Sequence, residues 1–187
     1  MALRNSEQSW GAVAQFLHWA VALAVIGLCV VGLLMQELPA SPTKIKVYAL
    51  HKSVGITVLA LVILRLLWRL VDRRPPHPAS MPRWQRTLSA LTHGLLYLLL
   101  LAMPLSGWLY NSASNFALRW FNLFSIPPLT GPDPAIKAWA QDLHSLGFYL
   151  LGLLFALHVG AALRHHYVER DATLLRMLPF VRKEPDA

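Results

Sequence analysis

The fold is decided by one apolar stretch, residues 143–163, which reads LHSLGFYLLGLLFALHVGAAL. It contains no Asp, Glu, Lys or Arg, and it is long enough to cross a bilayer, which takes about 20 helical residues. Two histidines lie in it, His144 and His158. At 3.6 residues per turn they point within roughly 40° of each other and lie about 21 Å apart along the axis. One helix face is therefore predicted to carry an imidazole toward each leaflet.

The composition of the whole chain argues against a soluble protein. Hydrophobic residues make up 56% of the 187 residues and charged residues only 14%, whereas soluble domains carry about 25% charge. We predict an all-α fold, an integral membrane four-helix bundle that forms one domain over residues 1–187. The first span is too long for the apolar region of a signal peptide. The expected spans are 12–36, 48–70, 87–110 and 138–166, and residues 170–180 are expected to form an interfacial helix.

The 17 basic residues orient this bundle. An even number of helices places both termini on one side, where twelve of the basic residues are expected, against five on the other. This excess predicts that both termini are cytoplasmic. The net charge of +8 is then explained by topology and by attraction to anionic lipid, so no nucleic-acid partner is expected. The twelve are Arg4, Arg65, Arg69, Arg73, Arg74, Arg83, Arg86, Arg164, Arg170, Arg176, Arg182 and Lys183, and the five are Lys44, Lys46, Lys52, Arg119 and Lys137.

Eight histidines are many for so apolar a chain, because an imidazole inside a bilayer needs a partner. Sorted by depth along the expected spans, His51 and His144 share an outer level. His18, His93 and His158 share an inner level. The remaining three are expected as interfacial residues at or beyond the inner boundary, and they are His77, His165 and His166.

Histidines paired at two depths are typical of bis-histidine haem, in which the iron takes one imidazole on each side of the ring. The outer pair is His51 with His144, whereas the inner level offers three candidates for two positions. Zinc is disfavoured because the histidines lie on separate helices, and a proton relay because the apolar stretches hold no Asp or Glu. Four glycines near these histidines would leave room for a flat ring, although helix packing also explains them, and they are Gly55, Gly94, Gly147 and Gly160.

Several short motifs accompany the histidines. They are FLHW (16–19), HKSVG (51–55), LRLLWR (64–69), MPLSG (103–107) and LRMLP (175–179), together with His93, Tyr97, His144, His158, the HHY run at 165–167 and Asp171. In these motifs the sequence resembles the bacterial cytochrome b561 family of di-haem membrane cytochromes, from about residue 10 to residue 180. The resemblance implies two haem b groups, with His51 and His144 as axial ligands of the outer one. For the inner haem it implies His18 and His158, which leaves His93 to the quinone site or the inner-haem environment.

The resemblance also implies a multi-pass protein of the bacterial inner membrane that transfers single electrons. Members of the family are associated with superoxide oxidation at the periplasmic face and with ubiquinone reduction, the activity of a superoxide:quinone oxidoreductase. Lys52, beside His51, is expected to steer the superoxide anion. Further candidates for a quinone site are Arg65, Ser89 and Tyr97, which could equally contact haem propionates or pack helices.

Two other functions stay open at this stage. The chain can be a haem b anchor subunit that passes electrons from a partner dehydrogenase or hydrogenase to quinone, in which case the donor is a protein and not superoxide. It can also be a haem-free membrane scaffold. Between the third and fourth spans, residues 111–134 form an apolar loop that is expected to cover the outer mouth of the bundle.

Overall fold

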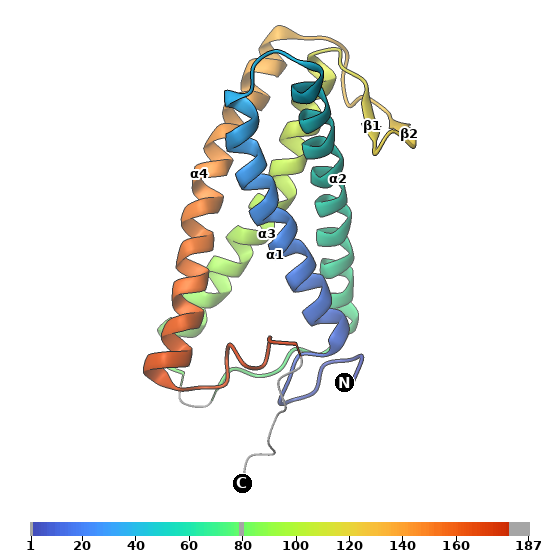
Figure 1. Cartoon of the computed structure of the whole chain (residues 1–187). Helices are drawn as coiled ribbons and strands as arrows, with labels where there is room; N and C mark the ends of the chain where they lie inside the picture. The colour runs from blue at the N-terminus through green and yellow to red at the C-terminus, as the bar shows by residue number, and fades with distance from the viewer. Residues whose placement is uncertain (1, 79–80, 180–187) are drawn as a thin grey trace.

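The molecule is a bundle of long helices, as Figure 1 shows. The computed structural model describes residues 2–78 and 81–179. Each helix is long and apolar enough to cross a membrane, which confirms the predicted all-α membrane bundle. The helices are α1 (Ala12–Glu37), α2 (Pro42–Val71), α3 (Arg83–Ala113) and α4 (Pro134–Arg164), and α4 continues into one π-helical turn, η1 (His165–Glu169).

Three helices, α2, α3 and α4, begin earlier than hydropathy predicts, and two of them, α2 and α4, open with a polar cap that hydropathy does not detect. The Ser41 hydroxyl accepts a hydrogen bond of 3.2 Å from the backbone of α2, and Pro42 occupies the first turn. Asp133 accepts bonds of 2.8 Å and 3.0 Å from the first backbone N–H groups of α4, again with a proline, Pro134, in the first turn. The helices therefore extend beyond the apolar core of each span.

The buried core is a layer of aliphatic side chains halfway along the bundle. It consists of Val21 and Val25 from α1, Val58 and Val62 from α2, and Leu151 from α4. Leu151 lies midway in sequence between His144 and His158, so this layer separates the outer from the inner histidine level. The layer keeps water and polar groups away from the middle of the bundle.

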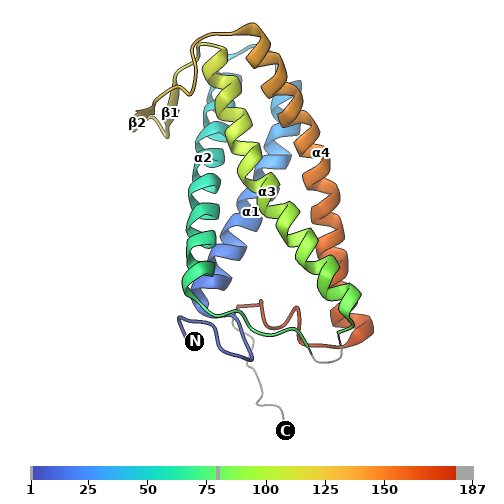
Figure 2. The ribbon, with the colours of Figure 1, turned by 180° about the vertical axis from the view of Figure 1, so that it is seen from behind.

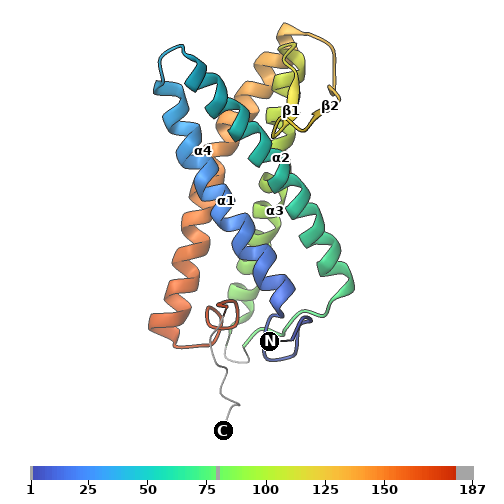
Figure 3. The same ribbon diagram turned by 45° about the vertical axis from the view of Figure 1, so that its right-hand side comes forward.

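The two ends of the bundle differ. We call the end that carries residues 2–11 and 170–179 the inner end, and the opposite one the outer end. The outer end carries a hairpin of strands β1 (Leu118–Trp120) and β2 (Phe124–Ile126), which Figures 2 and 3 show beside the upper part of α2 and α3. The inner end receives ten of the twelve basic residues predicted there, while Arg182 and Lys183 lie outside the described residues.

The hairpin is not the cover over the outer mouth that the sequence predicted. It lies against α2, where the Trp120 indole donates to the Thr57 hydroxyl (3.0 Å) and the backbone N–H of Phe121 donates to the Ser53 hydroxyl (3.0 Å). The turn places Phe121 and Asn122 at φ values of 44° and 60°, the left-handed geometry of tight hairpin turns. These hydrogen bonds to α2 therefore hold the hairpin at the side of the bundle.

The helical conformation predicted for residues 170–180 is wrong, because residues 171–179 form a series of turns, and residue 180 lies outside the described part. Arg170 takes a left-handed conformation, φ 53°, which ends the helical path. The side chains of α1 then bind the backbone of this segment: Gln15 donates to the carbonyl of Arg176 (3.1 Å) and Trp19 to that of Met177 (2.9 Å). The carbonyls of this segment therefore accept hydrogen bonds from side chains of α1, and residues 171–179 cover the inner end of the bundle.

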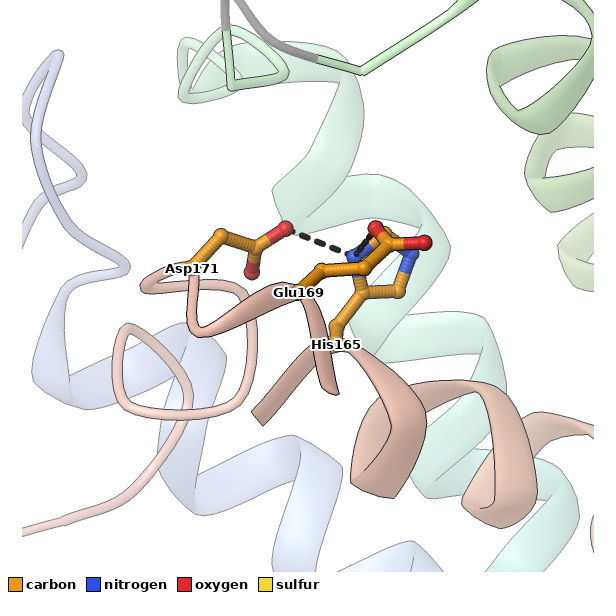
Figure 4. A group of neighbouring side chains, drawn as sticks. All are labelled: His165, Glu169 and Asp171. Atoms are coloured by element: carbon orange, nitrogen blue, oxygen red, sulfur yellow. Dashed lines mark hydrogen bonds and ion pairs between the residues drawn. The ribbon is translucent and has the colours of Figure 1, made fainter. Parts of the chain in front are cut away.

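His165, which the sequence predicted at the inner boundary, anchors this turn segment. Its side chain is buried to 11% exposure, with Nδ1 2.8 Å from Glu169 and 2.6 Å from Asp171 (Figure 4). The other Glu169 oxygen pairs with Arg164 (2.9 Å) and accepts from Gln85 of α3 (2.9 Å). The cluster therefore fastens the end of α4 to the turn segment and to α3.

Candidate functional site

Histidine side chains meet at two levels of the bundle. At the outer level, the ring centres of His51 on α2 and His144 on α4 lie 6.4 Å apart. At the inner level, the ring of His158 on α4 lies 6.2 Å from that of His18 on α1 and 5.2 Å from that of His93 on α3. The structure thus groups all five histidines as the depth sorting predicted.

These separations test whether the histidines fit haem. A bond from a metal to an imidazole nitrogen is about 2.0 Å long, and the ring centre lies about 1.1 Å farther on, so two imidazoles on opposite sides of one metal have centres about 6.2 Å apart. The pairs His51–His144 and His18–His158 fit this value, and His93–His158 is about 1 Å too short. The residues therefore fit two bis-histidine haems, and the distances favour His18 over His93 as the inner partner of His158.

The ring of His144 is held in a defined orientation. Its Nδ1 lies 3.0 Å from the Met103 carbonyl and 3.0 Å from the Ser106 hydroxyl, which itself donates to the same carbonyl (2.8 Å). Both neighbours then accept, so Nδ1 carries the proton and Nε2 keeps a free lone pair. Second-shell bonds of this kind fix the tautomer of a metal-binding histidine. Nε2 of His144 is therefore left available as a metal ligand.

His51, which faces His144, has no such support. Its Nδ1 is buried and has no hydrogen-bond partner among residues 2–78 and 81–179. The ring instead lies against Gly32 of α1, where an added Cβ would come within 3.4 Å of Cε1. Gly107 of α3 makes room for His144 in the same way, at 3.3 Å.

The glycines that contact the histidine rings are not those singled out from the sequence. An added Cβ would meet nothing within 4 Å at Gly55, Gly94 or Gly160, and at Gly147 it would meet Met103. Sequence proximity to a histidine was the wrong signal, because the glycine that makes room for a ring lies on a neighbouring helix. For Gly107, the MPLSG motif offered the better indication.

The predicted steering residue, Lys52, lies at the outer level next to His51. Its ammonium group donates to the Asn111 side chain of α3 (3.0 Å), and it has no carboxylate within ion-pair distance in the described part of the chain. Its positive charge is therefore not neutralised by a carboxylate. The ammonium group of Lys52 is held near the outer histidine pair, where it can attract an anion.

The residues predicted for a quinone site lie together at the inner level, in two pairs. The Ser89 hydroxyl is 3.3 Å from Nδ1 of His93, one helical turn away on α3. The guanidinium of Arg65 on α2 donates to the phenol oxygen of Tyr97 on α3 (2.9 Å). Because His93 also contacts the ring of His158, polar groups able to hydrogen-bond a quinone adjoin the inner histidine pair.

Comparison with known proteins agrees with this geometry. A family model described as prokaryotic cytochrome b561 matches residues 9–180. The chain belongs to the prokaryotic cytochrome b561 family. It is 31% identical over 182 residues to the cytochrome b561 homolog 2 of Escherichia coli K12, covering 95% of each chain. It is also 33% identical over 165 residues to cytochrome b561 homolog 1 of the same organism, covering 88% of this chain and 93% of the relative.

A third relative of this cytochrome b561 chain has a name that states an activity. It is the probable superoxide oxidase CybB of Yersinia pestis, 31% identical over 173 residues, covering 87% of this chain and 92% of the relative. Family membership makes the chain a membrane electron-transfer protein and implies b-type haem. Six-coordinate haem carries electrons and has no free position for oxygen, in agreement with histidines in facing pairs.

Proposed function

We propose that this cytochrome b561 protein is a di-haem superoxide:quinone oxidoreductase, with His51 and His144 holding the outer haem and His18 and His158 the inner one. One observation carries the proposal: two histidine pairs with ring centres 6.2 Å and 6.4 Å apart lie at two depths of one bundle. A haem between each pair supplies one-electron transfer when it is bound. The chain itself fixes the ligands and excludes water.

The residues at the two histidine levels and in the aliphatic layer between them have different roles. Helix α4 supplies one ligand at each level, so its rigidity sets the distance between the two sites, about 21 Å along the axis between His144 and His158. The aliphatic layer around Val58 and Val62 holds no charged group, and ions and protons therefore meet a barrier that electrons do not.

At the outer end, Lys52 attracts the superoxide anion toward His51. Each superoxide ion gives up one electron and leaves as molecular oxygen, so no bond between heavy atoms forms or breaks and no side-chain nucleophile is needed. Two such electrons, with two protons, convert one quinone to quinol at the inner level. There His93, Ser89, Arg65 and Tyr97 offer the hydrogen-bond partners that the quinone oxygens require.

The orientation follows from charge. The inner end carries most of the arginines, and the positive-inside bias then places it in the cytoplasm and the outer end in the periplasm. We propose the bacterial inner membrane as the location. The name of the Yersinia relative, probable superoxide oxidase, supports superoxide as the donor, and the protein then needs no partner subunit.

Stopped-flow mixing of the oxidised, haem-loaded protein with superoxide tests the proposal. We expect haem reduction at a rate near encounter that falls as ionic strength rises. Lys52→Gln should lower this rate about threefold at low salt and leave it nearly unchanged at high salt. Arg73→Gln removes the same charge from the exposed inner end and should have no effect on reduction from the outer side.

Three results would contradict the proposed function. Absence of haem reduction by superoxide, together with recovery of a stoichiometric iron–sulfur partner, would assign the chain as an anchor subunit. Absence of a b-type α band in the reduced-minus-oxidised spectrum would leave a haem-free scaffold. An equal effect of Lys52→Gln and Arg73→Gln would remove the steering role of Lys52.

A further inference from the structure

A hollow of about 320 Å³ lies between the inner halves of α2 and α3. Its apolar wall consists of Leu66 and Leu70 from α2 and Ala90 and Gly94 from α3. Leu70, Ala90 and Gly94 are exposed, and an added Cβ on Gly94 would meet nothing within 4 Å. The hollow therefore opens outward, and in a bundle that crosses a membrane its surroundings are lipid.

Two arginines occupy the innermost part of this hollow. Arg69 lies in the last turn of α2, with its guanidinium carbon 5.4 Å from the centre of the Tyr97 ring. Arg74 follows the helix and is exposed. In the described part of the chain neither guanidinium has a carboxylate within ion-pair distance. Both positive charges therefore stay uncompensated by protein at the level where lipid headgroups lie.

The acidic residue between these arginines does not neutralise them. Asp72 accepts hydrogen bonds from the backbone N–H groups of Asn5 (3.0 Å) and of Arg73 (3.1 Å), so its carboxylate is bound to the N-terminal segment. The hollow thus combines two unpaired guanidiniums at its inner edge with an apolar wall that runs toward the bilayer centre.

We propose that this hollow binds an anionic phospholipid, with Arg69 and Arg74 pairing with the phosphate and an acyl chain lying along Leu66, Leu70 and Gly94. Guanidinium groups match the oxygens of a phosphate, and basic pockets between membrane helices suit anionic headgroups. A free phosphate would leave the apolar wall unused. A quinone ring carries no charge and would leave both arginines unpaired. Tyr97 lines this hollow and also belongs to the proposed quinone site, so the two sites adjoin, and the lipid site is distinguished by its phosphate contacts to Arg69 and Arg74.

Native mass spectrometry of the full-length, haem-loaded protein tests the proposal. Delipidated protein is incubated with equal amounts of phosphatidylglycerol and phosphatidylcholine. We expect one phosphatidylglycerol to be retained per chain in preference to phosphatidylcholine. The double variant Arg69→Gln/Arg74→Gln should bind phosphatidylglycerol roughly tenfold more weakly, because both charge-assisted contacts are lost. The matched control Arg73→Gln/Arg83→Gln removes two exposed charges at the same end outside the hollow and should bind like the wild type.

A second variant tests the proposal independently, in case the arginine variant does not fold. Gly94→Leu fills the hollow where no atom lies within 4 Å of the new Cβ, and it keeps both arginines. It should also weaken retention of phosphatidylglycerol, since the acyl chain loses its space. If only the arginine variant loses the lipid, the apolar wall plays no part and the proposal fails.

Four further outcomes would overturn the inference. Equal loss in the two double variants would mean general charge attraction. Equal retention of the two lipids by the wild type would mean no headgroup recognition, and full competition by inorganic phosphate would mean a free-anion site. Finally, the arginine variant could lose haem, or it could need a different quinone concentration for saturation while it still retains phosphatidylglycerol. Either result would assign the arginines to the redox sites.

Discussion

The outer and inner histidine levels use the same helix in different ways. At the outer level two histidines face each other, and one of them, His144, is oriented by the carbonyl of Met103 and the hydroxyl of Ser106. At the inner level three histidines cluster, and His93, whose Nδ1 lies 3.3 Å from the Ser89 hydroxyl, has the ring separation that does not fit a shared iron. The outer level therefore has a pair in which one ring, that of His144, is oriented by hydrogen bonds, and the inner level has a pair with an additional polar neighbour.

In the function proposed above, the two levels have different tasks within one electron path. A site that only accepts an electron needs a rigid ligand set and a nearby cation, and the outer level provides both through His144 and Lys52. A site that reduces a quinone needs hydrogen-bond donors beside the ligands, and the inner level provides them through His93 and Tyr97. The comparison predicts that substitutions affect one level at a time.

The largest expected effect comes from removing one proposed ligand. His51→Ala or His144→Ala should remove the outer haem and leave the inner one, so that the haem-to-protein ratio falls by half. His158→Ala should do the reverse. Haem content by pyridine haemochrome, together with a redox titration of the remaining haem, measures both outcomes.

The inner level is the sharper test, because it offers a spare histidine. His18→Ala should lose the inner haem, whereas His93→Ala should keep both and slow only the reoxidation by quinone. Retention of both haems in His18→Ala with loss of one in His93→Ala would exchange the roles of these residues. It would also show that the ring separation of 5.2 Å adjusts when haem binds.

The orientation of His144 predicts a smaller effect on redox potential. Ser106→Ala removes one of the two acceptors of the Nδ1 proton, which makes the imidazole a weaker electron donor. One hydrogen bond is worth about 1 kcal/mol, and 59 mV corresponds to a tenfold change for one electron, so the outer midpoint potential should rise by on the order of 40 mV. A potentiometric titration of the variant measures this shift.

The inner haem serves as the internal control for Ser106→Ala, and its potential should stay constant. Ser106→Thr keeps the hydroxyl and should keep the outer potential close to that of the wild type. If both haems shift together in Ser106→Ala, the substitution acts through the packing of α3 and not through the Nδ1 hydrogen bond.

Much of this arrangement could be predicted from the sequence, since hydropathy defines the spans and helical spacing places His144 and His158 at two depths. Which helices contact each other could not be predicted, because rotation about each axis depends on packing. Gly32 and Gly107 were therefore missed, although each lies against a histidine ring of the outer level.

The segments outside the spans were predicted less well. The hairpin at 118–126 is held by side chains such as Ser53, whose role on α2 has no signature in the sequence. The turns at 171–179 form because Gln15 and Trp19 bind carbonyls more than 150 positions away in the chain. Long-range polar contacts override local helical preference in both places, and a single sequence does not reveal such contacts.

The smallest effect is expected from a substitution in the turn segment, residues 171–179. It compares the inner end of the bundle with the outer end. The turn segment closes the inner end through Trp19, the neighbour of His18, and depends on the pairing of His165 with Asp171. Asp171→Asn should loosen residues 171–179, raise their amide exchange rates roughly tenfold, and change haem content very little. The matched variant Asp133→Asn keeps an N-cap at the outer end and should leave these exchange rates unchanged.

Acid should reproduce the effect of Asp171→Asn. Burial acts to raise the pKa of Asp171, but hydrogen bonds from Thr173 and from His165 outweigh it and hold that pKa below its ordinary value of about 3.9. A depressed pKa in the folded state stabilises the protein above the ordinary value, and this contribution is lost as pH falls through the depressed one. Protection of residues 171–179 should therefore persist from pH 7 to about pH 4 and decline only below it. A decline that begins well above pH 4 would show that Asp171 does not control the closure of the inner end, and hydrogen exchange at a series of pH values measures where the decline begins.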